Sequence, residues 1–201
     1  MSDKFQDKYR IPSSRLSNWD YGCNAIYFVT ICTAHRECYF GNIVKMQNVE
    51  TQDFASLPPK MELSEIGKIA HHYWIEIPNH FPFVELGEFV VMPNHIHGVI
   101  IIDKPNGKAV GDATVETQNF ASLPPRQNNV NTFGPQSQNL ASIIRGYKTG
   151  VKKYATLNMI DFAWQSRFHD HVIRNDGSFQ HISGYIQNNP SNWADGKLYV
   201  P

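Results

Sequence analysis

The chain has 201 residues, of which 41% are hydrophobic and 12% aromatic, and its 18 Lys and Arg balance its 18 Asp and Glu. This composition is typical of a globular protein with a sizeable core. The apolar runs fall well short of the roughly 20 residues that a bilayer-spanning helix requires, so we expect no membrane partner. A formal charge of zero argues mildly against nucleic-acid binding, which usually depends on neutralising phosphates.

The N-terminus and the cysteines predict a cytoplasmic location. Residues 1–10 are polar, carry mixed charges and lack the apolar stretch of a secretory signal. The 3 cysteines are an odd number without C-x-x-C spacing. Such a set fits reduced thiols better than a disulfide framework or a zinc cage.

The first half of the chain predicts the element order β-β-α-β. Residues Asn24–Thr33 are β-branched or aromatic on both faces, which predicts a central strand, and Cys38–Met46 is expected to pair with it. Ser64 is expected to cap a helix that ends at Pro78. Five further elements, two strands, a helix, a short strand and a final helix, are expected at Val84–Met92, His95–Asp103, Leu140–Tyr154, Arg167–Ile173 and about Ser178–Asn188.

Two copies of one segment interrupt this pattern. VETQDFASLPPK at residues 49–60 recurs as VETQNFASLPPR at 115–126, with ten of the twelve positions alike but different flanks. A duplicated structural unit would repeat its strands and helices, so we interpret the segments as repetitive sequence inserted into loops. We therefore expect one domain over residues 1–201, with flexible inserted loops at 47–60 and 104–138.

Two short patterns carry possible chemistry. His95 and His97 are two positions apart in a predicted strand, which puts both imidazoles on one face, where they can meet one ion. An isolated H-x-H pair commonly has no such role. On the final helix, however, Tyr185 and Asn189 are four residues apart, so an amide oxygen and a phenol can face the same ion. Tyrosine is a weak nucleophile that needs a base or a metal-activated electrophile.

Three separated motifs resemble one enzyme family. VVMPNHIHGVIII at residues 90–102, WQSRFHDHVIRN at 164–175 and YIQNNP at 185–190 resemble, in this order, the REP-associated tyrosine transposases. These are relatives of the insertion-sequence-200-like transposases within the single-tyrosine HUH endonucleases. Residues 27–41 also resemble the family's opening strands, so the resemblance covers most of the chain outside the two loops.

The resemblance implies an α+β fold, a ferredoxin-like HUH nuclease domain in which helices pack on one face of an antiparallel β-sheet. It implies that His95, His97 and Asn189 hold a divalent metal, Mg²⁺ or Mn²⁺, and that Tyr185 is the catalytic nucleophile. By residue type alone, two imidazoles suggest zinc as readily. The implied partner is single-stranded DNA folded into a hairpin. It is cleaved to a 5′-phosphotyrosine and a free 3′-hydroxyl, often by a homodimer, which implies association with the nucleoid.

Five basic side chains are candidate DNA contacts. Arg145, Lys148 and Lys152 recur at three- and four-residue steps along one side of a predicted helix, which suits phosphate tracking. A solvated basic face is the alternative. Arg167 and Arg174 flank the short strand within a family-like motif.

A second H-x-H pair, His169 and His171, lies in the predicted short strand. Because the resemblance assigns metal binding to the first pair, we expect a structural or substrate-facing role for the second. Two other functions stay open: a catalytically silent DNA-hairpin-binding protein of the same fold, and a zinc-dependent hydrolase that uses both pairs.

Overall fold

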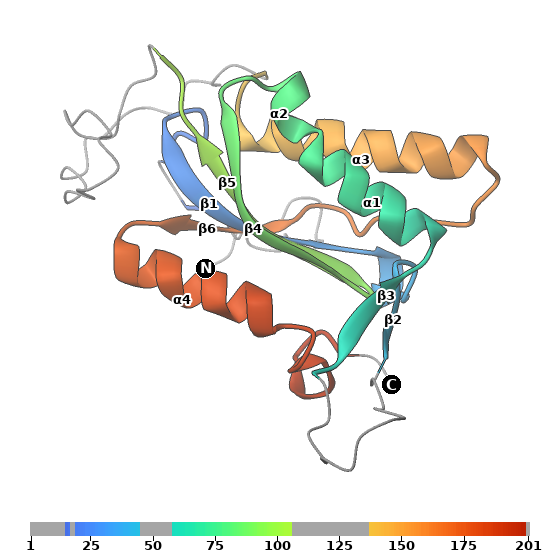
Figure 1. Ribbon diagram of the computed structural model, residues 1–201. Helices are drawn as coiled ribbons and strands as arrows, with labels where there is room; N and C mark the ends of the chain where they lie inside the picture. The colour runs from blue at the N-terminus through green and yellow to red at the C-terminus, as the bar shows by residue number, and fades with distance from the viewer. Residues whose placement is uncertain (1–14, 17–18, 45–57, 106–136, 200–201) are drawn as a thin grey trace, which may run out of the picture.

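The computed structural model describes residues 15–16, 19–44, 58–105 and 137–199 (Figure 1). The inserted loops expected at 47–60 and 104–138 lie almost entirely outside these residues, so their flexibility stays a prediction. No helix within the described ranges is long and apolar enough to cross a membrane.

Four antiparallel strands form the main sheet in the order β4-β5-β1-β6. Strand β1 (Ala25–Cys32) lies between β5 (His95–Ile102) and β6 (His169–Ile173), and β4 (Val84–Met92) forms the far edge. The predicted central position of the first strand is therefore confirmed. Its alternate side chains are buried against α1 and α3, and the others are half-buried on the opposite face.

The connections between these strands give a ferredoxin-like topology. Helix α1 (Glu65–Ile75) precedes β4, and α3 (Leu140–Leu157) connects β5 to β6, so the sheet is built in the order β-α-β-β-α-β. Both helices cover the same face of the sheet (Figure 1). The predicted α+β class with an antiparallel sheet is confirmed.

The helices do not all lie on one face, which corrects our expectation. Helix α4 (Asp176–Asn188) covers the opposite face of the sheet, away from α1 and α3 (Figure 1). There Ile186 packs with Val99 and Ile173 in a second apolar cluster. Because the central strands carry apolar side chains on both faces, both faces have to be covered to exclude water.

The second strand takes a different partner from the one predicted. Strand β2 (Gly41–Val44) pairs with β3 (Lys60–Leu63) in a separate two-stranded sheet, so the predicted pairing of Cys38–Met46 with β1 is wrong. A short 3-10 turn, Ala34–Arg36, contains two non-glycine residues with positive φ and leads the chain away from β1. Both edges of β1 are instead paired with β5 and β6.

The helix after β3 begins as predicted. The Ser64 side chain caps α1 by accepting a hydrogen bond from the backbone amide of Gly67. Pro78 does not end helical structure, because the short helix α2 (Ile77–His80) follows and holds this proline in its first turn, where no amide hydrogen bond is needed.

The contact between α1 and β5 depends on a glycine, Gly98, which has no side chain. Trp74 of α1 is fully buried against β5. A Cβ atom built on Gly98 would lie 2.2 Å from the Trp74 ring. Gly98 directly follows the H-x-H pair, so the position of that strand beneath α1 requires glycine at this residue.

Candidate active site

The two histidines of β5 lie on the sheet face that α4 covers. Alternation along the strand puts His95 and His97 on the same side as Val99, which packs with α4, whereas Ile96 enters the core beneath α1 and α3. His95 is 2% and His97 3% exposed, and their ring centroids are 4.5 Å apart. The two imidazoles therefore form one buried pair.

Helix α4 brings a phenol and an amide to this pair. The Tyr185 hydroxyl lies 3.2 Å from Nε2 of His97, and the tyrosine side chain is 47% exposed. Asn189, the C-cap residue of α4, is buried close to His95 and influences the pKa of its imidazole. All four residues singled out in the sequence thus come together, although Tyr185 and His97 are 88 residues apart.

Asn94, in the turn between β4 and β5, determines which ring nitrogen of His95 carries the proton. Its Nδ2 donates to the carbonyl oxygens of Arg36 and Leu198, at 3.1 and 2.8 Å. Its Oδ1 therefore faces the imidazole, 2.8 Å from Nδ1 of His95. Because an amide oxygen only accepts, Nδ1 carries the proton and Nε2 keeps a lone pair. This Nε2 is buried and has no hydrogen-bond partner in the described part of the chain.

Thr30 contacts the Nδ1 atom of His97, as Asn94 does that of His95. The two residues are directly opposite each other in the β1–β5 ladder, and Thr30 Oγ1 lies 2.9 Å from Nδ1 of His97. When Nδ1 donates to this hydroxyl, Nε2 accepts the hydrogen bond from Tyr185. In this tautomer of His97, both imidazoles have an unprotonated Nε2.

Burial keeps both imidazoles uncharged at neutral pH. It lowers the pKa of His95 to about 2, with smaller effects from the neighbouring His97 and Arg36, while Asn189 acts in the opposite direction. Burial, followed by the charge of His169, lowers the pKa of His97 to about 4. Neutral imidazoles are the form that binds a metal ion.

The donor set of the site consists of two imidazole nitrogens and the amide of Asn189. The described ranges contain no group of three or more His, Cys, Asp or Glu arranged to hold a metal ion. His169 and His171 are exposed and do not join the first pair in such a group. This arrangement does not support a zinc centre built from both H-x-H pairs, and an ion here would depend on Asn189.

Two aromatic rings border the site. Phe28 of β1 stacks on His97 with ring centroids 5.3 Å apart and meets the Tyr185 ring edge-on at 6.2 Å. Trp193, in the 3-10 helix η2 (Trp193–Asp195), stacks on His95 at 5.9 Å. These rings restrict the motion of the imidazoles and keep water from them.

The candidate DNA contacts lie elsewhere. Four of the five, Arg145, Lys148, Lys152 and Arg167, line a groove of about 700 Å³ between α3 and the segment before β6. Arg174 is not among its lining residues and follows β6 directly. The groove is lined by residues of α3, whereas Tyr185 belongs to α4, which covers the opposite face of the sheet from α3 (Figure 1). A DNA strand that contacts both the groove and Tyr185 would have to pass around the edge of the sheet that β6 forms.

The two lysines of the groove hold the protein's own backbone. Lys148 Nζ donates to the carbonyl oxygens of Gln165 and Arg167, at 2.7 and 3.1 Å. Lys152 Nζ donates to the carbonyl oxygen of Phe162 at 2.5 Å. These bonds attach residues 162–167 to α3, so the exposed guanidinium groups of the groove are better suited to phosphate contact.

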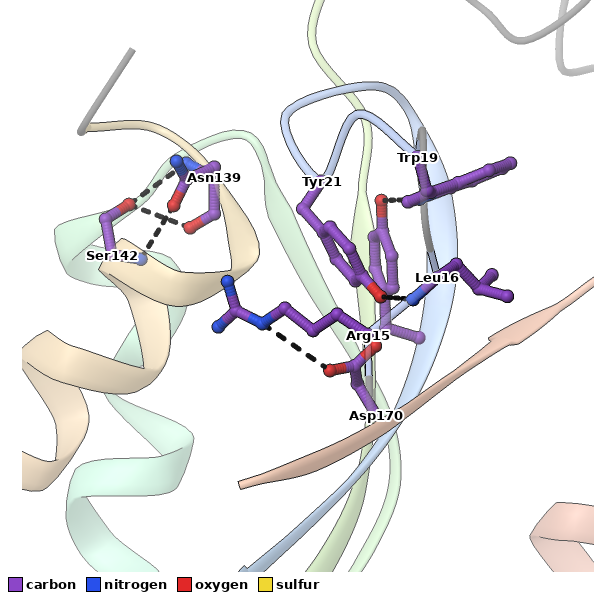
Figure 2. Close-up of polar contacts among 8 residues, drawn as sticks. Arg15, Leu16, Trp19, Tyr21, Asn139, Ser142 and Asp170 are labelled. Atoms are coloured by element: carbon purple, nitrogen blue, oxygen red, sulfur yellow. Dashed lines mark hydrogen bonds and ion pairs between the residues drawn. The ribbon is translucent and has the colours of Figure 1, made fainter. Parts of the chain in front are cut away.

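Arg15 also lines the groove, and its guanidinium points toward Asp170 (Figure 2). Its guanidinium lies over the rings of Tyr21 and Phe168, 5.3 and 5.1 Å from their centroids. Its Nε is 3.9 Å from Oδ1 of the buried Asp170. The pair connects the segment around Arg15 to β6 and places a positive charge near a buried carboxylate.

Sequence reasoning missed the residues that support the site, namely Thr30, Asn94, Phe28 and Trp193. A hydroxyl in the otherwise apolar strand around Thr30 was a signal, but its meaning depends on the register with β5. The role of Asn94 depends on its hydrogen bonds to the carbonyl groups of Arg36 and Leu198, which are distant in the sequence.

Comparison with known proteins finds similarity both in sequence and in structure. No protein-family model matches the chain. An uncharacterized protein of Haemophilus influenzae is 36% identical over 190 residues, which are 94% of this chain and 92% of that protein. The solved structure of a REP-associated tyrosine transposase bound to a REP hairpin is similar with a TM-score of 0.48 and 17% identity, over 88% of this chain and 72% of that one. At this identity the similarity concerns the fold alone.

Proposed function

We propose that this chain, which belongs to the same family as the uncharacterized Haemophilus influenzae protein, is a metal-dependent single-stranded DNA endonuclease and strand transferase. One observation carries the proposal: the Tyr185 hydroxyl lies 3.2 Å from Nε2 of a buried, neutral histidine pair. A phenol beside two neutral imidazoles and an amide suits tyrosine attack on a phosphodiester.

His95, His97 and Asn189 are the residues that would hold the cation, for which we propose Mg²⁺ or Mn²⁺. The buried Nε2 of His95, which lacks a hydrogen-bond partner among the described residues, supports this assignment. When bound, the cation would withdraw charge from a phosphate oxygen and so make phosphorus more reactive. Because one lone pair serves one partner, cation binding at Nε2 of His97 and the hydrogen bond from Tyr185 exclude each other.

The chain's own contribution is the nucleophile and its position. The Tyr185 oxygen forms a bond to phosphorus and loses its proton, while the bond from phosphorus to the 3′-oxygen breaks and that oxygen gains a proton. The products are a 5′-phosphotyrosine and a free 3′-hydroxyl, so the energy of the broken bond is kept for rejoining. Phe28 and Trp193 hold the imidazoles in place during this exchange.

The substrate that we propose is single-stranded DNA that forms a hairpin, bound by one chain or a homodimer. The motif resemblance supports this choice, and the groove supplies the charge that the overall composition lacks. Arg145 and Arg167 are its exposed cationic contacts, Lys148 and Lys152 add to its positive potential, and Arg174 lies at the other end of β6.

Formation of a covalent adduct tests this function. The protein is incubated with labelled single-stranded hairpin DNA and Mg²⁺ or Mn²⁺, then denatured and separated by size. We expect an adduct with the unmodified protein and with Tyr199→Phe, which changes another exposed tyrosine, but none with Tyr185→Phe. Absence of any adduct, or an adduct that persists in Tyr185→Phe, rules the proposal out.

A catalytically silent hairpin-binding protein is the second candidate. The formal net charge of zero and the repeated segment inserted in two predicted loops favour it. Tight, metal-independent binding of hairpin DNA without cleavage would support this function, and strand transfer would exclude it.

A further inference from the structure

A second pocket lies beside the proposed nucleophile, between β6 and the N-terminal half of α4. Its volume is about 610 Å³. Three histidines line it, His169 and His171 from β6 and His181 from α4, together with Ser178 of α4 and Phe28 of β1. Phe28 stacks on His97, and His169 affects the pKa of His97, but His171, His181 and Ser178 have no part in the site described above.

The register of the sheet aligns this pocket with the active site. Thr30 of β1 is paired with His97 on one side and with His169 on the other. The three residues therefore form one row across the sheet face that α4 covers. One row further along, Phe28 is paired with both Val99 and His171. The pocket and the metal-ligand pair are thus two positions on one continuous surface, with β1 between them.

The spacing on α4 gives the same alignment from the other side. His181 and Tyr185 are four residues apart, so their side chains lie on the same side of the helix about one turn, or 5.4 Å, from each other. A nucleic-acid strand that presents one phosphate to Tyr185 and runs along α4 would bring a neighbouring phosphate toward His181.

The lining of the pocket is suited to an anion. An imidazole has at least one N–H donor whether it is neutral or protonated, and a serine hydroxyl donates as well. No Asp or Glu is among the described residues that line it. The pocket also adjoins the N-terminus of α4, whose dipole adds to its attraction for negative charge.

We propose that this pocket binds the phosphodiester group next to the one that Tyr185 attacks, through the imidazoles of His169, His171 and His181. The inference rests on the proposed function. These histidines are positioning residues: they set which linkage of the strand lies opposite the Tyr185 hydroxyl, and they take no part in bond making.

Imidazole NMR signals test the pocket without requiring cleavage. The full-length Tyr185→Phe protein is titrated with a thymidine tetranucleotide, with its uncharged methylphosphonate analogue, and with inorganic phosphate. We expect the signals of His169, His171 and His181 to shift with the charged tetranucleotide and not with the analogue. Equal shifts with both oligonucleotides would contradict the proposal, and so would equal shifts with inorganic phosphate, which would indicate a free-phosphate site.

Substitution of the pocket histidines provides a second test, in which the affinity for the tetranucleotide is measured. We expect His171→Gln/His181→Gln, made in the same Tyr185→Phe background, to bind the tetranucleotide about tenfold more weakly. The matched control His72→Gln, an exposed histidine of α1, should bind unchanged. In the enzyme with Tyr185 intact, the double substitution should raise KM for cleavage more than it lowers kcat.

The two proposals can fail separately. A protein that cleaves DNA while the double variant binds and cleaves normally refutes the pocket and leaves the nuclease. A protein that forms no adduct, but whose three histidines respond only to the charged strand, refutes the nuclease and leaves the pocket.

Discussion

The hydroxyl of Tyr185 lies 3.2 Å from Nε2 of His97, and Thr30 engages the other nitrogen of the same ring at 2.9 Å. The proposed nucleophile therefore contacts a histidine whose other ring nitrogen is bonded to a side chain of the neighbouring strand. Removing the Thr30 hydroxyl should change the chemistry at Nε2 while leaving the fold intact.

Thr30→Val should weaken Mn²⁺ binding about 10–100-fold, because His97 loses the acceptor that keeps the proton on Nδ1. Thr30→Ser, which keeps a hydroxyl at this position, should bind Mn²⁺ nearly as well as the unmodified protein. Isothermal titration with Mn²⁺ measures both. Equal affinity of the valine and serine variants would show that this hydroxyl does not orient the ligand.

Acid should destabilise the protein through its buried histidine pair. The folded-state pKa values of His95 and His97 are lowered to about 2 and about 4, whereas the unfolded chain binds these protons near pH 6.5. The unfolded state therefore takes up more protons below about pH 6.5. As the pH falls below about 6.5, each histidine should lower the free energy of unfolding by about 1.4 kcal/mol per pH unit. For His97 this decrease should end near its folded-state pKa of about 4.

Urea unfolding between pH 7 and pH 5 measures this dependence. The His95→Gln/His97→Gln variant provides the comparison, since it lacks both groups and should lose most of the slope. A variant that retains the full slope would assign the acid sensitivity to other residues.

Gly98→Ala should destabilise the fold strongly. A Cβ at this residue would lie 2.2 Å from the buried Trp74 ring, so α1 or β5 has to shift. We expect a loss of at least about 3 kcal/mol, the upper end of usual overpacking costs. Gly184→Ala is the matched control, since no described heavy atom lies within 4 Å of a Cβ there. It should stabilise α4 by about 0.5–1 kcal/mol. Thermal unfolding distinguishes the two, and a Gly98→Ala protein as stable as its parent contradicts the packing described.

Substitutions in the groove should have two kinds of effect, one on DNA binding and one on stability. Arg145→Gln should weaken single-stranded DNA binding and reduce the salt dependence of the binding constant by about one phosphate contact, without affecting stability. Lys152→Met should chiefly lower the melting temperature, because its ammonium group holds the carbonyl oxygen of Phe162. Filter binding across salt concentrations, together with thermal unfolding, measures both. If Lys152→Met affected only the salt dependence, its bond to the backbone would be of little consequence.

Much of the fold could be predicted from the sequence, because long apolar patterns indicate elements directly. The central strand β1 and the Ser64 cap of α1 were found in this way. Which strands pair was harder to predict: β2 follows β1 closely but pairs with β3, which lies beyond a segment outside the described residues. The second covered face of the sheet also escaped prediction, since an apolar stripe on α4 does not indicate which side of the sheet it meets.

The residues of the candidate site also differ in whether the sequence alone could predict them. His95, His97, Tyr185 and Asn189 were recognisable because each lies in a short local motif. Thr30 acquires its role only through its register opposite His97, and Asn94 through hydrogen bonds to carbonyl groups distant in the chain. Such roles depend on tertiary contacts that one sequence does not encode locally.

Identification of the residue joined to DNA is the most direct test of the central claim. The protein is reacted with single-stranded hairpin DNA and Mn²⁺, the adduct is digested with nuclease and protease, and the nucleotide-bearing peptide is sequenced by mass spectrometry. We predict a nucleotide attached through its 5′-phosphate to Tyr185. A nucleotide on any other residue, or on none under conditions in which the DNA is cleaved, would contradict the account.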